Sequence, residues 1–316
     1  MRSNLVLEFW DRKSFFETEE YPSYAKNLIN EKIKEDIDKG DITTNSLIDA
    51  NKEIKAHIIA REDGIVAGIE EISLILKEEV TAIKKDGSEV KNGDIILEIN
   101  GNARKILAYE RTILNILQRM SGIATLTYNT QKLADCFIAG TRKTLSLLDK
   151  KAVSVGQGLT HRLNLNDLIL IKDNHLKILG NNIGEALELA VKNTEIKDIE
   201  IEVKNEEEAL EAAETITKLK SEKLFAIMFD NMTPMEIKST ITKINNILKN
   251  NTTIIKNSIN NNLKNNNETE KIILVEASGG INKNNIEEYS KTGVDIISLG
   301  FLTHSAKALD LSLEIK

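Results

Sequence analysis

The sequence lacks several features that would point to particular classes of protein. Cys136 is the only cysteine among 316 residues, which excludes an intrachain disulfide and a cysteine-rich zinc site. No apolar run approaches the roughly 20 residues of a membrane span, and the first residues lack the apolar stretch of a signal peptide. We therefore expect a cytoplasmic protein in a reducing compartment, with no membrane partner.

Positively charged residues are fewer than negatively charged ones. The chain has 42 Lys and Arg against 49 Asp and Glu, a net charge of -7. Nucleic acids and anionic membranes favour a basic surface, so neither is the expected partner. A small anionic ligand in a local basic pocket stays open. Hydrophobic residues make up 41% of the chain, enough for two modest domains or for one barrel with an appendage.

The residue pattern of the first hundred residues changes near residue 50. Residues 1–50 are charged and helix-prone and end in GDITT, where Gly40 ends one element and Asp41 or Thr43 caps or turns the next. Residues 53–107 contain short β-branched segments separated by Gly or Asp-Gly. This pattern predicts an antiparallel sheet with hairpins, and hence a first domain.

A helical segment follows this sheet. Residues 108–134 place apolar side chains at helical spacing, as at Ile113, Leu114 and Leu117. Ser121-Gly122 interrupts the pattern, so we expect the helix to break or bend there and to form one or two linking helices.

The remainder of the chain alternates short apolar strands with polar helical segments. The expected strands are CFIAG, DLILI, DIEIEV, LFAIMF, KIILVEA and DIISLG. Six such units predict a parallel sheet, closed as an α/β barrel more readily than open. Residues 244–268 are rich in asparagine and are expected to form a solvated insertion or a helix extension between the LFAIMF and KIILVEA units.

The reactive residues of an α/β barrel lie where its strands end, at the C-terminal face. Polar and glycine residues follow each expected strand in this chain. They are Thr141, Arg142 and Lys143; Lys172 and Asp173; Glu202; Asp230; Ser278, Gly279 and Gly280; and Ser298 and Gly300.

The charges at these strand ends differ in sign. Residues 141–175 contain six Lys or Arg against three Asp, a local balance of plus three. This wall suits a carboxylate or phosphate, which Arg binds through two hydrogen bonds and Lys as a point charge. Glu202 and Asp230 form a second, acidic wall. It suits Mg²⁺, which one or two carboxylates hold together with water and substrate phosphates.

Glycines supply a third component. Gly279, Gly280 and Gly300 allow the backbone to approach an oxyanion closely, and loops after the last barrel strands commonly bind phosphate. The Ser278-Gly279-Gly280 segment fits a phosphate cradle and a simple tight turn equally well. The residues alone therefore indicate a protein that binds a phosphorylated polyanion, a metal and a second, carboxylated ligand.

The residues now described resemble one known family, the quinolinate phosphoribosyltransferases, also called nicotinate-nucleotide pyrophosphorylases (carboxylating). The matching segments include EDIDKGDITT, ERTILNILQRMSGIAT, GTRKT, GQGLTHRLNLNDLILIKDNH, FDNM, EASGGI and GVDIISLGFLTHSAKALDLSL. They are long, follow one another in order and cover most of the chain.

The resemblance implies a fold and a domain organisation. The expected fold is α/β: an N-terminal α/β sandwich domain at residues 1–115 and an incomplete α/β (TIM-like) barrel at residues 116–302, which carries the insertion at 244–268. Residues 303–316 are expected to form a C-terminal helix that packs back on the N-terminal domain. The family also assembles at least as a dimer, so a homodimer or a hexamer of dimers is expected.

The resemblance further implies the transfer of phosphoribose from phosphoribosyl pyrophosphate to quinolinate, with loss of CO₂ and formation of nicotinate mononucleotide and pyrophosphate. Mg²⁺ is the implied cofactor, at Glu202 and Asp230, directly or through water or pyrophosphate. Lys143, Lys172, Glu202 and Asp230 are the implied catalytic residues. The resemblance places Arg142, Lys143, His161, Arg162 and Lys172 around the quinolinate carboxylates, Arg111 across the dimer interface, and Ser278, Gly279 and Gly300 at the 5-phosphate. Further substrate-binding residues are expected at Thr141, Gly280 and Ser298.

Two departures from the family pattern affect the expected substrate loop. TRKTLSLLDKKAV is shorter than usual, lacks the Pro-Gly turn and lacks a following arginine, which Lys150 or Lys151 would have to replace. The usual triple glycine is Gly156-Gln157-Gly158, which restricts the turn. Both put substrate affinity in question more than reaction class.

Other readings stay open. His175 is expected to cap the chain after its strand, Arg119 to form a salt bridge, and His304 to lie near a helix start or near the phosphate. The rival functions are a ModD-like paralogue that acts on another anionic ligand and a catalytically silent ligand-binding relative. The intact IKDNH segment argues against the first, and the retention of all the charged site residues argues against the second.

Overall fold

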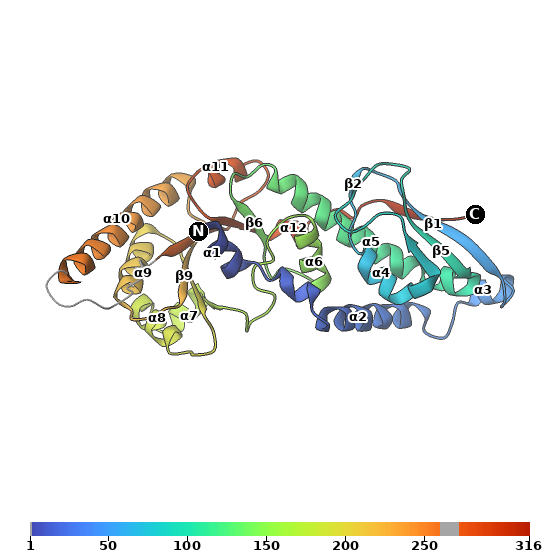
Figure 1. Ribbon diagram of the computed structural model, residues 1–316, viewed down its shortest axis with the longest axis horizontal. Helices are drawn as coiled ribbons and strands as arrows, with labels where there is room; N and C mark the ends of the chain where they lie inside the picture. Colours follow the sequence, from blue (N-terminus) through green and yellow to red (C-terminus); the bar gives the residue numbers. More distant parts are fainter. Residues whose placement is uncertain (1, 260–271) are drawn as a thin grey trace. The chain divides into compact units, whose positions relative to one another are not determined.

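A computed structural model describes residues 2–259 and 272–316, and the chain folds into two compact units (Figure 1). Unit 1 consists of Met1–Asp11, Leu133–Arg142 and His161–Leu299. Unit 2 consists of Arg12–Lys132, Lys143–Thr160 and Gly300–Lys316. Each unit therefore combines three separate stretches of the chain.

Unit 2 contains the antiparallel sheet that the sequence predicts. Its four strands lie in the order β12-β1-β5-β3, and two further short strands pair as β2-β4. The strands are β1 (Glu53–Ala60), β2 (Gly64–Ile65), β3 (Val80–Ala82), β4 (Glu89–Val90), β5 (Ile95–Asn102) and β12 (Leu311–Ile315).

Helices complete the core of unit 2, and some of them pack against this sheet. They are η1 (Lys13–Glu17), α2 (Glu20–Ile37), α3 (Ile42–Leu47), α4 (Ile69–Leu76), η2 (Lys77–Glu79), α5 (Ala103–Gln131), α6 (Leu147–Val155) and α12 (Phe301–His304). Ile58 of β1, Ile72 of α4 and Leu117 of α5 are fully buried in one apolar cluster. The predicted helix cap at Asp41 is confirmed, because its carboxylate accepts a hydrogen bond of 2.9 Å from the Thr44 N–H.

The expected break at Ser121-Gly122 is wrong. Helix α5 runs without interruption through both residues. The Ser121 hydroxyl bonds to the backbone of Ala67, and a Cβ on Gly122 would lie 2.1 Å from the carbonyl oxygen of Lys307. These small residues therefore allow two other segments to approach the helix, instead of ending it.

The expected C-terminal helix at residues 303–316 is also wrong. The segment has a four-residue helix, α12, followed by strand β12, which pairs antiparallel with β1. Leu311, Leu313 and Ile315 alternate with polar residues, the period of a strand, and β1 offers a free edge for pairing.

Unit 1 is built on a six-stranded parallel sheet in the order β6-β11-β10-β9-β8-β7. Within the described residues β6 and β7 are the unpaired ends of this order, as expected for an incomplete barrel. The elements are α1 (Arg2–Trp10), β6 (Phe137–Gly140), β7 (Ile169–Ile171), α7 (Asp173–Ile178), α8 (Ile183–Val191), β8 (Asp198–Val203), α9 (Glu206–Lys218), β9 (Leu224–Asp230), α10 (Pro234–Ile259), β10 (Ile273–Ser278), α11 (Ile286–Ser290) and β11 (Ile296–Leu299).

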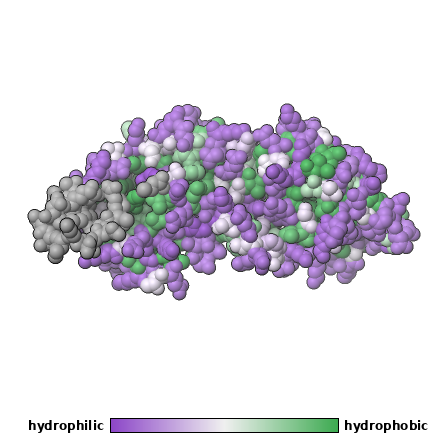
Figure 2. Space-filling view, viewed as in Figure 1, coloured by the Kyte–Doolittle hydropathy of each residue, from purple (hydrophilic) through white to green (hydrophobic). Residues whose placement is uncertain are grey.

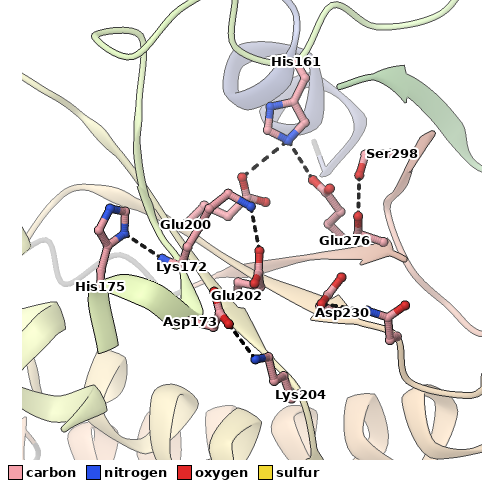
Figure 3. A network of polar contacts seen from close by, with 12 residues as sticks. His161, Lys172, Asp173, His175, Glu200, Glu202, Lys204, Asp230, Glu276 and Ser298 are labelled. Atoms are coloured by element: carbon pink, nitrogen blue, oxygen red, sulfur yellow. Dashed lines mark hydrogen bonds and ion pairs between the residues drawn. The ribbon is translucent and has the colours of Figure 1, made fainter. Parts of the chain in front are cut away.

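The strands of unit 1 are buried on both faces, which explains their nearly continuous apolar sequences. In β8 the alternation places Ile199 and Ile201 on one face and Glu200 and Glu202 on the other, and all four are buried. The acidic face of β8 therefore belongs to the interior of the barrel (Figure 3).

The asparagine-rich segment at 244–268 falls partly outside the described residues. Helix α10 extends to Ile259, so the first part of this segment is helical. The remainder lies beyond the part of the chain that the structure describes.

Hydrophilic side chains cover most of the visible surface, with smaller hydrophobic areas between them (Figure 2). Among the described residues, no helix combines the length and apolar character needed to cross a membrane.

Candidate active site

The C-terminal strand ends of unit 1 bring together several of the predicted site residues, among them Lys172, Glu202 and Asp230 (Figure 3). Lys172 follows β7, Glu202 lies near the end of β8, and Asp230 is the last residue of β9. Ser278 ends β10 directly opposite Asp230 in the sheet register, and its hydroxyl is hydrogen-bonded to that of Ser298 on β11 at 3.1 Å. The prediction that these residues share one edge of the sheet is therefore confirmed by the topology.

The expected separation into a basic and an acidic wall is only partly correct. Lys172 Nζ lies 2.7 Å from Glu202 Oε2, so a group of the basic wall is paired with one of the acidic wall. The Lys172 side chain is 44% exposed and that of Glu202 is 9% exposed. Because one end of this pair reaches solvent, an incoming anion can replace the carboxylate as the partner of Lys172.

Asp230 lies beside Glu202 in a partly buried position. Burial, followed by the negative charge of Glu202, raises the pKa of Asp230, while the Asn231 side-chain amide, 2.8 Å away, opposes this. Residue 279, after β10, has to be a glycine for a structural reason. A Cβ at this position would lie 2.5 Å from Asn231 Oδ1. Gly279, at φ +83°, thus allows the approach of the residue that holds Asp230.

Two guanidinium groups of unit 1, those of Arg142 and Arg162, lie close enough to repel each other. Arg162 is 8% exposed, and its pKa is lowered by burial and then by the charge of Arg142. Glu200, Asp167 and Glu276 oppose that shift. Arg162 is buried and Arg142 is exposed, and the two guanidinium groups together suit an anion with two charges.

A buried cluster lies beneath these charges. His161 Nε2 is 3.0 Å from Glu276 Oε2 and 3.5 Å from Glu200 Oε2, and Trp10 Nε1 donates a hydrogen bond of 3.2 Å to Glu200 Oε1 (Figure 3). Burial and the neighbouring charge of Glu276 raise the pKa of Glu200. Burial also opposes the charge on Glu276, but the facing His161 ring holds the pKa of Glu276 below its ordinary value.

Three of these residues were not identified as site residues from the sequence: Trp10, Glu200 and Glu276. The spacing of Glu200 and Glu202 by two contained a signal, because it places both carboxylates inside the barrel. Nothing in the sequence linked either of them to Trp10, which lies on the N-terminal helix α1.

Of the other predicted site residues, Thr141 and Gly280 belong to unit 1, whereas Arg111, Lys143 and Gly300 belong to unit 2. Arg111, on α5, lines a cavity of about 540 Å³ together with residues of α2 and α6. The Thr303 hydroxyl donates a hydrogen bond of 2.8 Å to the carbonyl oxygen of Lys143. A Cβ on Gly300 would lie 3.0 Å from Lys143 Cδ and 3.2 Å from His304 Nε2, so this glycine allows both side chains to come close.

The altered substrate loop belongs to unit 2, and its two lysines, Lys150 and Lys151, are both bound to other groups of that unit. Lys150 is fully buried and donates to the carbonyl oxygen of Thr160, and Lys151 pairs with Glu70 at 2.8 Å. Gln157 adopts a left-handed conformation, φ +69°, at the place of the usual central glycine. Gln157, which replaces the central glycine, therefore has a strained backbone conformation.

His175 and Arg119 have the structural roles expected of them. His175 Nδ1 accepts a hydrogen bond of 2.9 Å from the Lys172 N–H, so the expected cap is confirmed. Arg119 forms the expected salt bridge, with two bonds of 2.8 Å to Asp149. His304 Nδ1 lies 2.6 Å from the Ser305 hydroxyl.

Two groups of residues within the described ranges have three metal-ligand atoms within 4.8 Å of one another. They are His161, Glu200 and Glu276 in unit 1, and Glu70, Glu71 and Asp86 in unit 2. The predicted Mg²⁺ residues, Glu202 and Asp230, are not among them. Their carboxylates, at the ends of the neighbouring strands β8 and β9, are nevertheless the hard oxygen ligands that Mg²⁺ prefers, together with water and substrate phosphates.

Comparison with protein families identifies the chain. The model of the quinolinate phosphoribosyl transferase N-terminal domain matches residues 41–121, and that of the C-terminal domain matches residues 123–314. The chain belongs to the quinolinate phosphoribosyltransferase family.

Curated members of the family match this chain over most of its length. A probable nicotinate-nucleotide pyrophosphorylase (carboxylating) of Methanothermobacter thermautotrophicus is 38% identical and covers 92% of this chain and 98% of its own. The protein of that name from Methanocaldococcus jannaschii is 40% identical, covering 92% and 97%. The solved nicotinate-nucleotide pyrophosphorylase of Francisella tularensis is 31% identical, with a TM-score of 0.74 and coverage of 93% and 97%.

Proposed function

We propose that this chain transfers phosphoribose from phosphoribosyl pyrophosphate to the ring nitrogen of quinolinate. The 2-carboxylate leaves as CO₂, and the other products are nicotinate mononucleotide and pyrophosphate. The observation that supports this most is the grouping of Arg142, Arg162 and Lys172 with Glu202 and Asp230 in unit 1. The names of the curated relatives support the same activity.

Quinolinate is a planar dianion, and the basic residues suit its two carboxylates. Arg162 and Arg142 repel one another until an anion neutralises them, so a carboxylate that binds there relieves an existing strain. When quinolinate binds, Lys172 leaves Glu202 and pairs with the second carboxylate of the substrate. Thr141 and His161 complete this set as proposed from the family motif, as do Arg111 and Lys143 of unit 2.

Glu202 and Asp230 face the ribose in this proposal. Their negative charges stabilise the positive charge that grows on the sugar as the bond from C1 to pyrophosphate lengthens. Mg²⁺, when bound with phosphoribosyl pyrophosphate, supplies charge neutralisation to the departing pyrophosphate. Ser278 and Ser298 offer hydroxyls to the 5-phosphate, and Gly279, Gly280 and Gly300 are assigned to the same group from the motif.

The reaction needs no covalent nucleophile on the protein, because positioning and electrostatics suffice. The ring nitrogen attacks C1, and the alkylated ring becomes a cation that accepts electrons. The adjacent carboxylate then leaves as CO₂, and the electron pair left at C2 takes up a proton. Lys172 and the two arginines hold the ring without trapping the carboxylate that departs.

We further propose a homodimer, or a hexamer built from dimers, in which Arg111 crosses to the partner subunit. Its place on the wall of a cavity lined by α2, α5 and α6 supports this assignment. A cytoplasmic location is proposed because a lone cysteine suits a reducing compartment. Burial raises the pKa of this thiol, Cys136, to about 12, so it is unreactive.

Product analysis tests the proposed reaction. Purified protein with phosphoribosyl pyrophosphate, Mg²⁺ and quinolinate should form nicotinate mononucleotide, pyrophosphate and CO₂ in equal amounts, and chelation of Mg²⁺ should stop turnover. Turnover with another pyridine or pyrimidine acid but not with quinolinate would refute the substrate and favour the ModD-like alternative. Absence of turnover with every acid would favour a silent relative.

A further inference from the structure

Two buried carboxylates in unit 1 have no role in the proposed reaction. Glu200 of β8 and Glu276 of β10 are both 0% exposed, and one carboxylate oxygen of each lies within 4.8 Å of the other and of a His161 ring nitrogen. Oε2 of Glu200 and Oε1 of Glu276 have no hydrogen-bond partner among the described residues. Two adjacent carboxyl groups in an apolar interior are costly, so a compensating function is expected.

The contacts of His161 show what Glu276 does. The ring nitrogen Nδ1 accepts a hydrogen bond of 2.8 Å from the N–H of Arg162, so the proton of the neutral ring is assigned to Nε2. Nε2 therefore donates to Glu276 Oε2, at 3.0 Å. The ring is fixed at both nitrogens, one by Glu276 and the other by the backbone of Arg162.

The backbone at His161 is strained in a way that requires such support. Its φ of +53° lies in the left-handed region, which a residue with a Cβ seldom adopts unless its surroundings enforce it. This turn sets the direction in which the chain continues to Arg162. A change in the ring's orientation would therefore change the aim of the Arg162 guanidinium.

The second carboxylate supports the first. Trp10 Nε1 holds Glu200 Oε1, and the Trp10 and His161 rings lie 6.4 Å apart, so the indole also borders the cluster. The negative charge of Glu276 and Glu200 partly balances Arg162 against the repulsion from Arg142. The cluster thus stabilises the charged Arg162 guanidinium, which burial and the charge of Arg142 both disfavour.

We propose that Glu276 is a positioning residue that acts through His161 to aim Arg162 at the quinolinate carboxylates. Glu200, held by Trp10, keeps Glu276 in place. The inference rests on the proposed function, because it assigns the quinolinate carboxylates to Arg162. It concerns the affinity for one substrate and adds no chemical step.

The steady-state kinetics of three variants test this inference. Glu276→Ala should raise KM for quinolinate about 10- to 100-fold, since misplacing a binding group by about 1 Å can cost 100-fold. KM for phosphoribosyl pyrophosphate should change far less. Glu276→Gln keeps an oxygen that accepts from His161 Nε2, so it should restore most of the lost affinity. Glu71→Ala removes an equally buried carboxylate from unit 2 and should leave both KM values unchanged.

The outcomes separate this inference from the proposed function. If Glu276→Ala alters both KM values equally, or if Glu276→Gln is as impaired as Glu276→Ala, the positioning role is wrong. Should Glu276→Ala fail to fold, the two KM values of Glu276→Gln and Glu200→Gln are compared instead. A rise in KM for quinolinate alone in Glu200→Gln supports the role. An equal rise in both KM values contradicts it. A wild-type chain that neither binds nor converts quinolinate refutes the proposed function, and the inference with it.

Discussion

The two units each bury an acidic cluster, and the two clusters differ in what surrounds them. In unit 1, Glu200 and Glu276 face His161, whose neighbour Arg162 is a candidate substrate-binding residue. In unit 2, Glu71 and Asp86 lie with the exposed Glu70. Both clusters contain buried carboxylate oxygens without a hydrogen-bond partner in the described part of the chain.

The partners of the unit 2 cluster are structural. The Tyr21 hydroxyl donates a hydrogen bond of 2.6 Å to Glu71, and Asp86 accepts one of 2.8 Å from the Ile69 N–H at the start of α4. Lys151 pairs with Glu70 and lies over the rings of Phe16 and Tyr21, 5.6 and 5.8 Å from their centroids. Burial raises the pKa of both Glu71 and Asp86. A perturbed carboxylate therefore indicates function only where its neighbours are groups that can meet a substrate.

The largest difference between the units is expected when a lysine that pairs with a glutamate is replaced in each of them. Lys172→Ala in unit 1 should weaken quinolinate binding by about 2–3 kcal/mol, the scale for loss of a charge-assisted contact. Phosphoribosyl pyrophosphate should still bind. Lys151→Ala in unit 2 should lower the melting temperature and leave quinolinate affinity unchanged. Titration calorimetry and thermal unfolding of both variants measure this.

Equal loss of both substrates in Lys172→Ala would contradict the assignment of this lysine to quinolinate. A loss of quinolinate affinity in Lys151→Ala would mean instead that Lys151 replaces the arginine missing from the shortened loop.

A smaller effect, on stability alone, is expected from Asp86. Burial raises the pKa of Asp86 from 3.8 to about 7. The folded state therefore binds this proton more tightly than the unfolded state, and the resulting stability is lost as the pH rises from about 4 to 7. Asp86→Asn stays neutral and keeps an oxygen for the Ile69 N–H. It should exceed the wild type in unfolding free energy by roughly 1–3 kcal/mol at pH 8, and by less at pH 5.

Urea unfolding at the two pH values measures this difference. Asp49→Asn is the matched control, because Asp49 is exposed and also accepts a backbone hydrogen bond, 2.8 Å from the Asn51 N–H. An Asp86→Asn variant that is less stable than the wild type at pH 8 would show that Asp86 is needed in its charged form.

Much of the fold could be predicted because its signals are local. The alternation of strands and helices, the cap at Asp41 and the polar residues at the strand ends follow from nearby residues. The role of Ser121-Gly122 could not be predicted, because Ala67 and Lys307 decide it and both are distant in the sequence. The strand at Leu311–Ile315 had a local signal in its alternating pattern, but its partner β1 lies at the other end of unit 2's chain.

The candidate site divides in the same way. Lys172, Glu202 and Asp230 could be identified because each ends or follows a strand. The pairing of Lys172 with Glu202 depends on the register of neighbouring strands, in which Ile169 pairs with Ile199. Trp10 reaches Glu200 from a helix at the start of the chain, so only the folded chain shows this contact.

Comparison of the binding of quinolinate and nicotinate to the wild-type protein tests whether unit 1 recognises a dicarboxylate. Nicotinate has the same ring but only one carboxylate. We expect quinolinate to bind at least about tenfold more tightly, because Arg142, Arg162 and Lys172 offer contacts for two carboxylates. One charge-assisted contact contributes at least about 1.4 kcal/mol. Equal affinities in titration calorimetry would contradict the proposal that unit 1 recognises a dicarboxylate.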